Sequence, residues 1–235
     1  MHSNRYTFLY SIGISILTAV LLSITAEGLK PAQEANILLD KKSNILRSVL
    51  VEETERNAIE NMYAERVKAL VINSKGEEIP NQNALGIVLK EELGKPETER
   101  HLPLYVYSNT DGKKYYIVPL QGVGLWGPIG GYISISPDFN TVYGAFFEHK
   151  SETPGLGAEI AEKPFQAQFQ GKKIMDDHNQ FISVNVVKKA AKVDFGNEHR
   201  VDGISGGTIT STGTDKMLKN CMKQYLAYFE KVKTH

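Results

Sequence analysis

Ten residues near the C-terminus, 202–211 (DGISGGTITS), combine glycines with hydroxyl side chains just before a predicted helix; we call them the threonine loop. Thr208 has no adjacent base, so its hydroxyl is a poor nucleophile, but it can accept a group from a separate transferase if the loop is exposed. Gly203, Gly206 and Gly207 would give such an enzyme access to the backbone, and nearby amides could hold an attached phosphate. No lysine follows the glycines where a P-loop requires one. An ordinary hydroxyl-rich loop before a helix is the alternative.

A second segment, 122–127 (GVGLWG), formally matches the pattern G-x-G-x-x-G of dinucleotide-binding proteins. In that fold a helix begins at the glycines, so that the pyrophosphate lies at the helix N-terminus. Here Pro128, two more glycines and the strand-like YISIS follow, so no helix can start and we reject dinucleotide binding. We interpret the segment as a glycine-rich turn between strands. Its backbone could approach a planar ligand closely, with Trp126 offering an aromatic face, although a single tryptophan is more often a packing residue.

A third segment, 149–157 (HKSETPGLG), directly follows a predicted strand, and we call its last six residues the ETPGLG loop. Proline fixes one backbone angle, and the two glycines allow conformations that are closed to other residues. A tight loop with exposed amides is therefore expected, suited to holding the polar edges of a ligand; a plain turn is the alternative. His149 and Glu152 could suggest a metal pair, but no third ligand lies nearby in sequence, and we predict no metal site.

Two helices and several strands are predicted around these segments. Residues 36–75 carry apolar side chains at helical spacing among charges, which indicates a connecting helix. Residues 214–232 form a second amphipathic pattern, and Thr212 with Asp215 fits a capping box at its start. Strands are predicted at 104–108, 114–120, 132–136, 141–148 and 181–188, the first two joined by the turn signal Asp111-Gly112. The predicted fold class is α+β, a largely antiparallel sheet with flanking helices.

The N-terminal residues 6–26 contain no charge and are long enough to cross a hydrocarbon core of roughly 30 Å as a helix. We predict a retained single-pass anchor, with a cleaved signal peptide as the alternative. The flanking charges weakly favour a cytoplasmic N-terminus. The whole chain carries 27 basic and 27 acidic residues, which gives no electrostatic reason to bind nucleic acid. Its one cysteine excludes an internal disulfide framework and cysteine-ligated metal sites within the chain.

The pattern Asp202-Gly203-x-Ser205-Gly206-x-Thr208 resembles the target motif of bacterial flavin transferases, which use FAD and magnesium to join FMN by its phosphate to the motif's threonine. Together with the glycine-rich turn, the ETPGLG loop, QFQGK at 168–172 and the anchor, it closely resembles the C subunit of the sodium-translocating NADH:quinone reductases over essentially the whole chain. The G subunit of the Rnf ferredoxin:NAD complex shares part of this pattern and is the alternative family. Gly207 stands where the reductase family usually has alanine, and the lost methyl group should not prevent flavinylation.

The resemblance implies a covalent FMN on Thr208, an anchor at 1–30, a helical connector and the start of the soluble domain at 31–98, and an FMN-binding domain at 99–235. It implies no catalytic residue, because the chain would pass electrons without turnover of its own. The remaining predicted cofactor-binding residues come from all three segments: Ser205, Gly206, Gly207, Ile209 and Thr210 around the phosphate, and Glu152, Thr153, Gly155, Leu156, Gly157, Leu125 and Trp126 around the flavin and its ribityl chain.

The resemblance also implies a place in the cell and a set of partners. The soluble domain would lie on the periplasmic side of the bacterial inner membrane. Its partners would be multi-span membrane subunits, a subunit with NADH, FAD and iron–sulfur sites, and the maturing flavin transferase. Two hypotheses from other classes stay open at this point: a membrane-tethered interaction module without flavin, and a soluble FMN enzyme acting on a small molecule.

Overall fold

A computed structural model describes residues 4–233 and divides the chain between Asp40 and Lys41 into two compact units. The predicted anchor at 1–30 therefore begins with three residues outside the described range. Helix α1, Asn4–Ser48, contains an apolar stretch long enough to cross a membrane, and none of that stretch is buried against protein. Length and composition thus support the membrane anchor that the sequence predicts.

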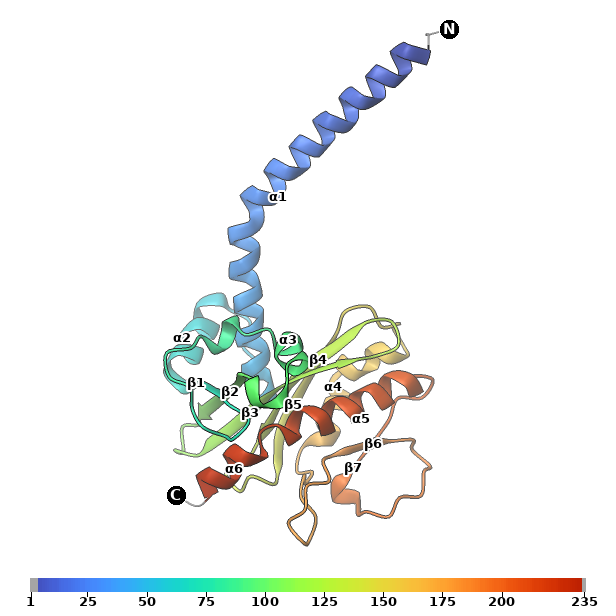
Figure 1. The fold of residues 1–235 in the computed structure, drawn as a ribbon. Coiled ribbons are helices and arrows are strands. Elements are labelled where there is room, and N and C mark those ends of the chain that lie inside the picture. The colour runs from blue at the N-terminus through green and yellow to red at the C-terminus, as the bar shows by residue number, and fades with distance from the viewer. Residues whose placement is uncertain (1–3, 234–235) are drawn as a thin grey trace. The chain divides into compact units, whose positions relative to one another are not determined.

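The second unit is built on one antiparallel sheet whose five strands follow one another in chain order (Figure 1). The strands are β1 (Val67–Ile72), β2 (Leu102–Ser108), β3 (Lys114–Val123), β4 (Pro128–Ile135) and β5 (Val142–His149). Strands β2 to β5 follow one another through short connections, whereas residues 73–101, with three short helices, join β1 to β2; every pairing is antiparallel. The predicted α+β class and the hairpin at Asp111-Gly112 are confirmed.

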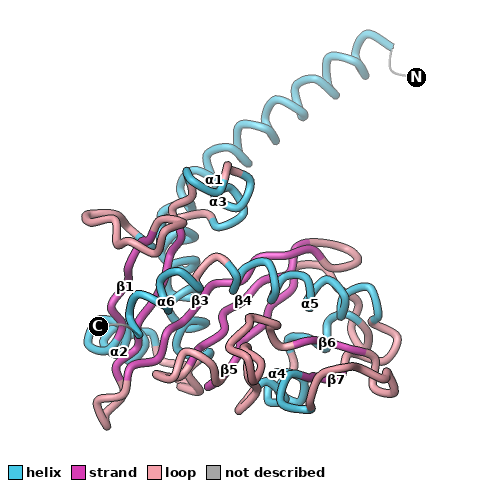
Figure 2. The backbone as a smooth tube through the Cα atoms, turned by 60° about the horizontal axis from the view of Figure 1, so that its bottom comes forward, coloured by secondary structure: helices cyan, strands magenta, loops and turns pink. Residues whose placement is uncertain are grey.

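One face of the sheet is covered by two C-terminal helices, α5 (Thr208–Lys223) and α6 (Leu226–Lys233), which run across the strands in Figure 2. Their apolar side chains close the main core against the sheet, with Leu218 and Phe229 almost completely buried. The hydroxyl of Tyr225, between the two helices, donates to the Pro103 carbonyl on β2 at 2.9 Å. This packing fixes where α5 begins, beside the end of β3.

Smaller elements complete the unit. The short α-helices are α2 (Arg56–Arg66), α3 (Leu89–Gly94) and α4 (Lys163–Gln166), and the two short parallel strands are β6 (Asn185–Val187) and β7 (Arg200–Asp202). The 3₁₀-helices are η1 (Ala84–Gly86), η2 (Glu97–Glu99), η3 (Gly157–Ala161), η4 (Ala167–Phe169) and η5 (Asn197–His199). The predicted strand at 181–188 is therefore only partly right, because only residues 185–187 form a strand and Phe181 makes one isolated bridge to Met175.

The predicted continuous helix over 36–75 is wrong beyond Ser48. Leu50 takes a left-handed φ of 62°, and the Val51 amide donates to the Leu46 carbonyl at 3.1 Å, which is the hydrogen-bond pattern of a Schellman cap. A new helix, α2, follows. The later residues of the segment, VKALVI, form β1, because they pair with β2 and their β-branched side chains suit a strand.

The predicted start of the C-terminal helix is also wrong. Helix α5 begins at Thr208, six residues before the predicted boundary, and Gly207 occupies the N-cap position without a capping side chain. Thr212 lies inside the helix, where its hydroxyl donates to the Thr208 carbonyl at 2.9 Å, so it does not form a capping box with Asp215. The threonine loop and the helix therefore meet at the candidate attachment residue.

Candidate functional site

The glycine-rich turn is a tight hairpin between β3 and β4. The Gly124 amide donates to the Gly127 carbonyl at 2.8 Å, and the chain returns directly as strand β4. No helix follows the glycines, which agrees with the rejection of a dinucleotide-binding fingerprint. The turn passes so close to α5 that a Cβ at Gly213 would collide with the Val123 carbonyl. The turn and the helix are thus direct neighbours.

Glu152, the first residue of the ETPGLG loop, connects the turn to the helix. Its side chain is buried, with the residue only 5% exposed. One carboxylate oxygen accepts the Trp126 amide at 2.8 Å, and the other accepts the Thr210 hydroxyl at 2.6 Å. Both oxygens are therefore bonded to protein groups, and whether Glu152 also contacts a flavin stays a prediction.

The electrostatics of Glu152 follow from these partners. Burial alone would raise the pKa of this carboxyl, because a charge in a low-dielectric site is unfavourable. Hydrogen bonds act in the opposite direction: the carboxylate accepts from the Thr210 hydroxyl and from the amides of Leu125, Trp126 and Gly127. Together these bonds outweigh the effect of burial and hold the pKa of Glu152 below its usual range. At neutral pH the junction between the three segments is therefore an ionised carboxylate.

The rest of the ETPGLG loop lies against the threonine loop. Leu156 is beside the glycines at 206 and 207, since a Cβ on Gly206 would come within 2.6 Å of the Leu156 side chain. Gly206 has a φ of +76° and Gly155 one of +74°, conformations that other residues rarely adopt. Gly206 therefore leaves room for the Leu156 side chain against the threonine loop, whereas Gly155 serves the turn of its own loop, where an added Cβ would meet no neighbour.

Thr208 is exposed at the first position of α5. The loop before it is well fixed, because the Ile204 amide donates to the Ser211 hydroxyl at 2.9 Å and the Gly207 amide to the Ile204 carbonyl at 3.1 Å. The amides of the first helical turn have no acceptor within the helix, and Gly207 supplies no capping side chain. The hydroxyl of Thr208 therefore lies at a rigid helix start with open amide donors and a positive dipole end.

Exposed apolar side chains gather in the same three segments. Between Lys41 and Lys233 the described chain exposes seven large apolar residues, and five of them belong to the turn and the two loops: Val123, Leu125, Trp126, Leu156 and Ile209. Trp126 is 66% and Val123 70% exposed. An exposed apolar cluster of this kind indicates a surface that something else covers. The sequence interpretation did not include Val123 among the site residues. The one feature that could have indicated it is its position as an apolar residue at the very end of a strand.

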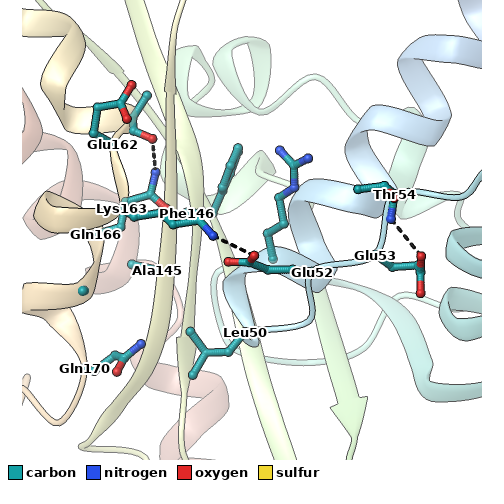
Figure 3. Close-up of a pocket in the computed structure, with 13 residues that line it drawn as sticks. Leu50, Glu52, Glu53, Thr54, Ala145, Phe146, Glu162, Lys163, Gln166 and Gln170 are labelled. Atoms are coloured by element: carbon teal, nitrogen blue, oxygen red, sulfur yellow. Dashed lines mark hydrogen bonds and ion pairs between the residues drawn. The ribbon is translucent and has the colours of Figure 1, made fainter.

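Of two hollows in the second unit, one adjoins the site. One, of about 630 Å³, is bordered by Gly155, Gly203 and Ser205 and so adjoins the threonine loop. The other, of about 450 Å³, lies behind β5, where Leu50 and Phe146 line it and the Lys163–Glu52 ion pair of 2.7 Å spans it (Figure 3). None of the predicted site residues borders this second hollow, so it offers no rival site for the chemistry of the three segments.

The predicted site residues are thus largely brought together. Leu125, Trp126, Leu156 and Ile209 are exposed on the three segments, whereas Thr210 and Gly157 are buried where Glu152 joins the turn to α5. His149 lies at the end of β5, where its Nδ1 accepts the Glu152 amide at 3.3 Å. Gln168, from the QFQGK segment, supports the threonine loop from outside by accepting the Asp202 amide at 3.0 Å.

Comparisons with known proteins agree on one family. The FMN-binding domain family matches residues 124–223, which include all of the ETPGLG loop and Thr208. The C subunit of the Na⁺-translocating NADH-quinone reductase of Vibrio parahaemolyticus is 32% identical over 223 residues, covering 86% of this chain and 84% of that protein.

Two solved structures share the fold. The crystal structure of the same subunit from Parabacteroides distasonis is 42% identical, with a TM-score of 0.77 over 86% of this chain and 96% of that one. That of Shewanella oneidensis NqrC is 26% identical, with a TM-score of 0.71 over 87% of this chain and 100% of that one.

Proposed function

We propose that this chain, which belongs to the family of the C subunits of Na⁺-translocating NADH-quinone reductases, is a membrane-anchored electron carrier holding FMN through a phosphoester bond to Thr208. The observation that carries the proposal is the position of Thr208: an exposed hydroxyl at a helix start, within a motif of the flavin-transferase type and beside an exposed apolar cluster. FMN supplies the electron transfer, and the protein supplies attachment, orientation and electrostatics.

The start of α5 suits a phosphoester. A phosphate on the Thr208 oxygen would carry negative charge at the positive end of the helix dipole, beside amides that have no other helical acceptor. In the proposed maturation step the Thr208 oxygen bonds to the FMN phosphorus of FAD, the hydroxyl proton is lost and AMP leaves. Ser205, Gly206, Gly207, Ile209 and Thr210 would then surround the phosphate, with Thr210 contributing its backbone because its hydroxyl is bonded to Glu152.

The exposed apolar cluster suits the flavin ring system. Leu125 and Trp126 from the turn and Leu156 from the ETPGLG loop would cover part of it, while Thr153, Gly155 and Gly157 would contact its polar edges or the ribityl chain. Burying these apolar surfaces would stabilise the attached cofactor by the ordinary hydrophobic effect. No enclosed substrate pocket is needed, because electron exchange requires only the close approach of two cofactors, and we expect no turnover by this chain alone.

The apolar part of α1 supports a single-pass anchor in the bacterial inner membrane, and we propose that the flavin-bearing unit lies on the periplasmic side. The proposed partners are the multi-span membrane subunits of the reductase and its subunit with NADH, FAD and iron–sulfur sites. A flavin transferase is the maturation partner.

Intact-mass measurement of the full chain, made in cells that contain the flavin transferase, tests the attachment. The wild type should carry the mass of one FMN less one water, and Thr208→Val should lose it. Thr212→Val is the matched control, because Thr212 is also exposed and lies one helical turn away; it should keep the flavin. An unmodified wild type would overturn the proposal and favour a tethered interaction module, and flavin retained on Thr208→Val would place the bond elsewhere.

A further inference from the structure

We propose that Glu152 is a positioning residue of the flavin site: its side chain bonds the glycine-rich turn to the first turn of α5 and so holds the turn in a fixed place relative to that helix start. This inference rests on the proposed function, because Glu152 would position the Leu125 and Trp126 side chains against a flavin attached to Thr208. The role differs from a direct contact with the cofactor: Glu152 would act through the residues that it holds.

The bonds of Glu152 reach across the chain. Its partner Trp126 lies 26 residues earlier and its partner Thr210 lies 58 residues later. The turn, the ETPGLG loop and helix α5 are therefore joined at one buried carboxylate, although no local sequence signal links them. Thr210 is two residues beyond Thr208 and is itself only 1% exposed, so the junction lies directly behind the attachment point.

The backbone around Glu152 is shaped to admit it. A Cβ on Gly124 would lie 2.5 Å from one carboxylate oxygen, and a Cβ on Gly157 would collide with the other. Neither glycine has a left-handed φ, so close approach to Glu152, and not backbone conformation, accounts for the absence of a side chain there. Two of the motif glycines thus make room for this carboxylate.

The turn side of the junction requires an acceptor. The turn offers amide N–H donors at Leu125, Trp126 and Gly127, and α5 offers the Thr210 hydroxyl. A carboxylate accepts on both oxygens, whereas a glutamine accepts on one side and donates on the other. Glutamine at 152 could keep its oxygen on the turn amides while the Thr210 hydroxyl rotates to accept, so it should preserve the turn. Methionine, of similar length but without an acceptor of this strength, should release it.

Trp126 makes the test direct, since it is the only tryptophan and so reports on the turn alone. The full chain is prepared in detergent without the transferase, and tryptophan anisotropy and acrylamide quenching are measured well below the melting temperature. Glu152→Met should lower the anisotropy and increase the quenching, and Glu152→Gln should restore values close to the wild type. Glu159→Met is the matched control, because Glu159 lies in the adjoining η3 and also accepts a backbone amide, that of Gly155 at 3.0 Å.

A second readout uses the flavin-loaded chain. If Trp126 is held against the flavin, it should quench the flavin fluorescence. The fluorescence per attached flavin should therefore rise in Glu152→Met relative to the wild type and stay unchanged in Glu159→Met. Unchanged tryptophan anisotropy in Glu152→Met overturns the inference. So does a lowered anisotropy that is accompanied by no change in flavin fluorescence. A wild type that carries no flavin sinks the proposed function instead, and the flavin-free measurement still decides whether Glu152 holds the turn.

Discussion

Replacing Thr210 by valine tests the energetics of the junction behind Thr208. The change keeps the side-chain shape but removes the hydroxyl that donates to the Glu152 carboxylate at 2.6 Å. Both groups are buried, at 1% and 5% exposure, so water cannot easily replace the lost donor. A hydrogen bond to a charged group contributes about 1.5–3 kcal/mol. For a unit of this size each kcal/mol corresponds to roughly 2–4 °C, so we expect the melting temperature to fall by roughly 3–12 °C.

The assay is thermal and urea unfolding of the full chain in detergent at neutral pH, with two matched variants. Thr210→Ser keeps a hydroxyl and should restore most of the stability. Thr214→Val removes an equally buried hydroxyl on the same helix, but one that donates to a helix carbonyl, that of Thr210 at 3.0 Å. That loss should cost roughly 1 kcal/mol or less, because no charge is left without a partner.

The pH dependence gives a further check on Thr210→Val. Because the folded pKa of Glu152 is lowered, the ionised carboxylate stabilises the fold above its ordinary pKa of 4.5, and this contribution is lost as pH falls through the folded value. The stability difference between wild type and Thr210→Val should therefore be largest near neutral pH and shrink in acid. Equal losses for Thr210→Val and Thr214→Val, or a difference that does not change with pH, would refute the charged hydrogen bond as the cause.

Two further predictions concern buried groups away from the site. Tyr63→Phe should not lower the free energy of unfolding, because the buried Tyr63 hydroxyl has no hydrogen-bond partner among the described residues. Tyr225→Phe should lower it by about 1 kcal/mol, because the bond to the Pro103 carbonyl is lost. Urea unfolding compares the two, and a loss for Tyr63→Phe as large as that for Tyr225→Phe would contradict the reasoning. Burial raises the pKa of Cys221 to about 11, so a thiol reagent at pH 8 should label it only after denaturation, and rapid labelling of the native chain would show that α5 opens.

Much of the fold follows from local patterns in the sequence. The hairpin at Asp111-Gly112 and the strands on either side were predictable because turn chemistry and alternation act over a few residues. The segment 67–72 was not, because its apolar residues fit a helix as well as a strand, and only pairing with β2 decides between them. The start of α5 was misplaced for a different reason: Thr212 resembles a capping residue in the sequence, but its hydroxyl donates to a carbonyl one helical turn earlier, because the helix already begins at Thr208.

The three segments of the site were recognisable from their unusual residues, but their geometry was not. Nothing in the sequence indicates that the carboxylate of Glu152 would face the turn 26 residues before it and the helix 58 residues after it. That arrangement depends on β5 ending beside the β3–β4 hairpin, which is a property of the sheet order. The sequence pattern therefore predicts which residues matter, and the topology determines which of them support the others.

The position of Thr208 limits how far an attached cofactor can travel. Its backbone is the first residue of a helix, held by the Ile204–Ser211 and Glu152–Thr210 bonds on either side. If this oxygen carries FMN, the movable part of the tether is only the threonine side chain, the phosphate and the ribityl chain. A flexible attachment segment would instead have allowed a swinging carrier. With the helix start fixed, redox partners would have to approach such a flavin, because its short tether could not carry it to them.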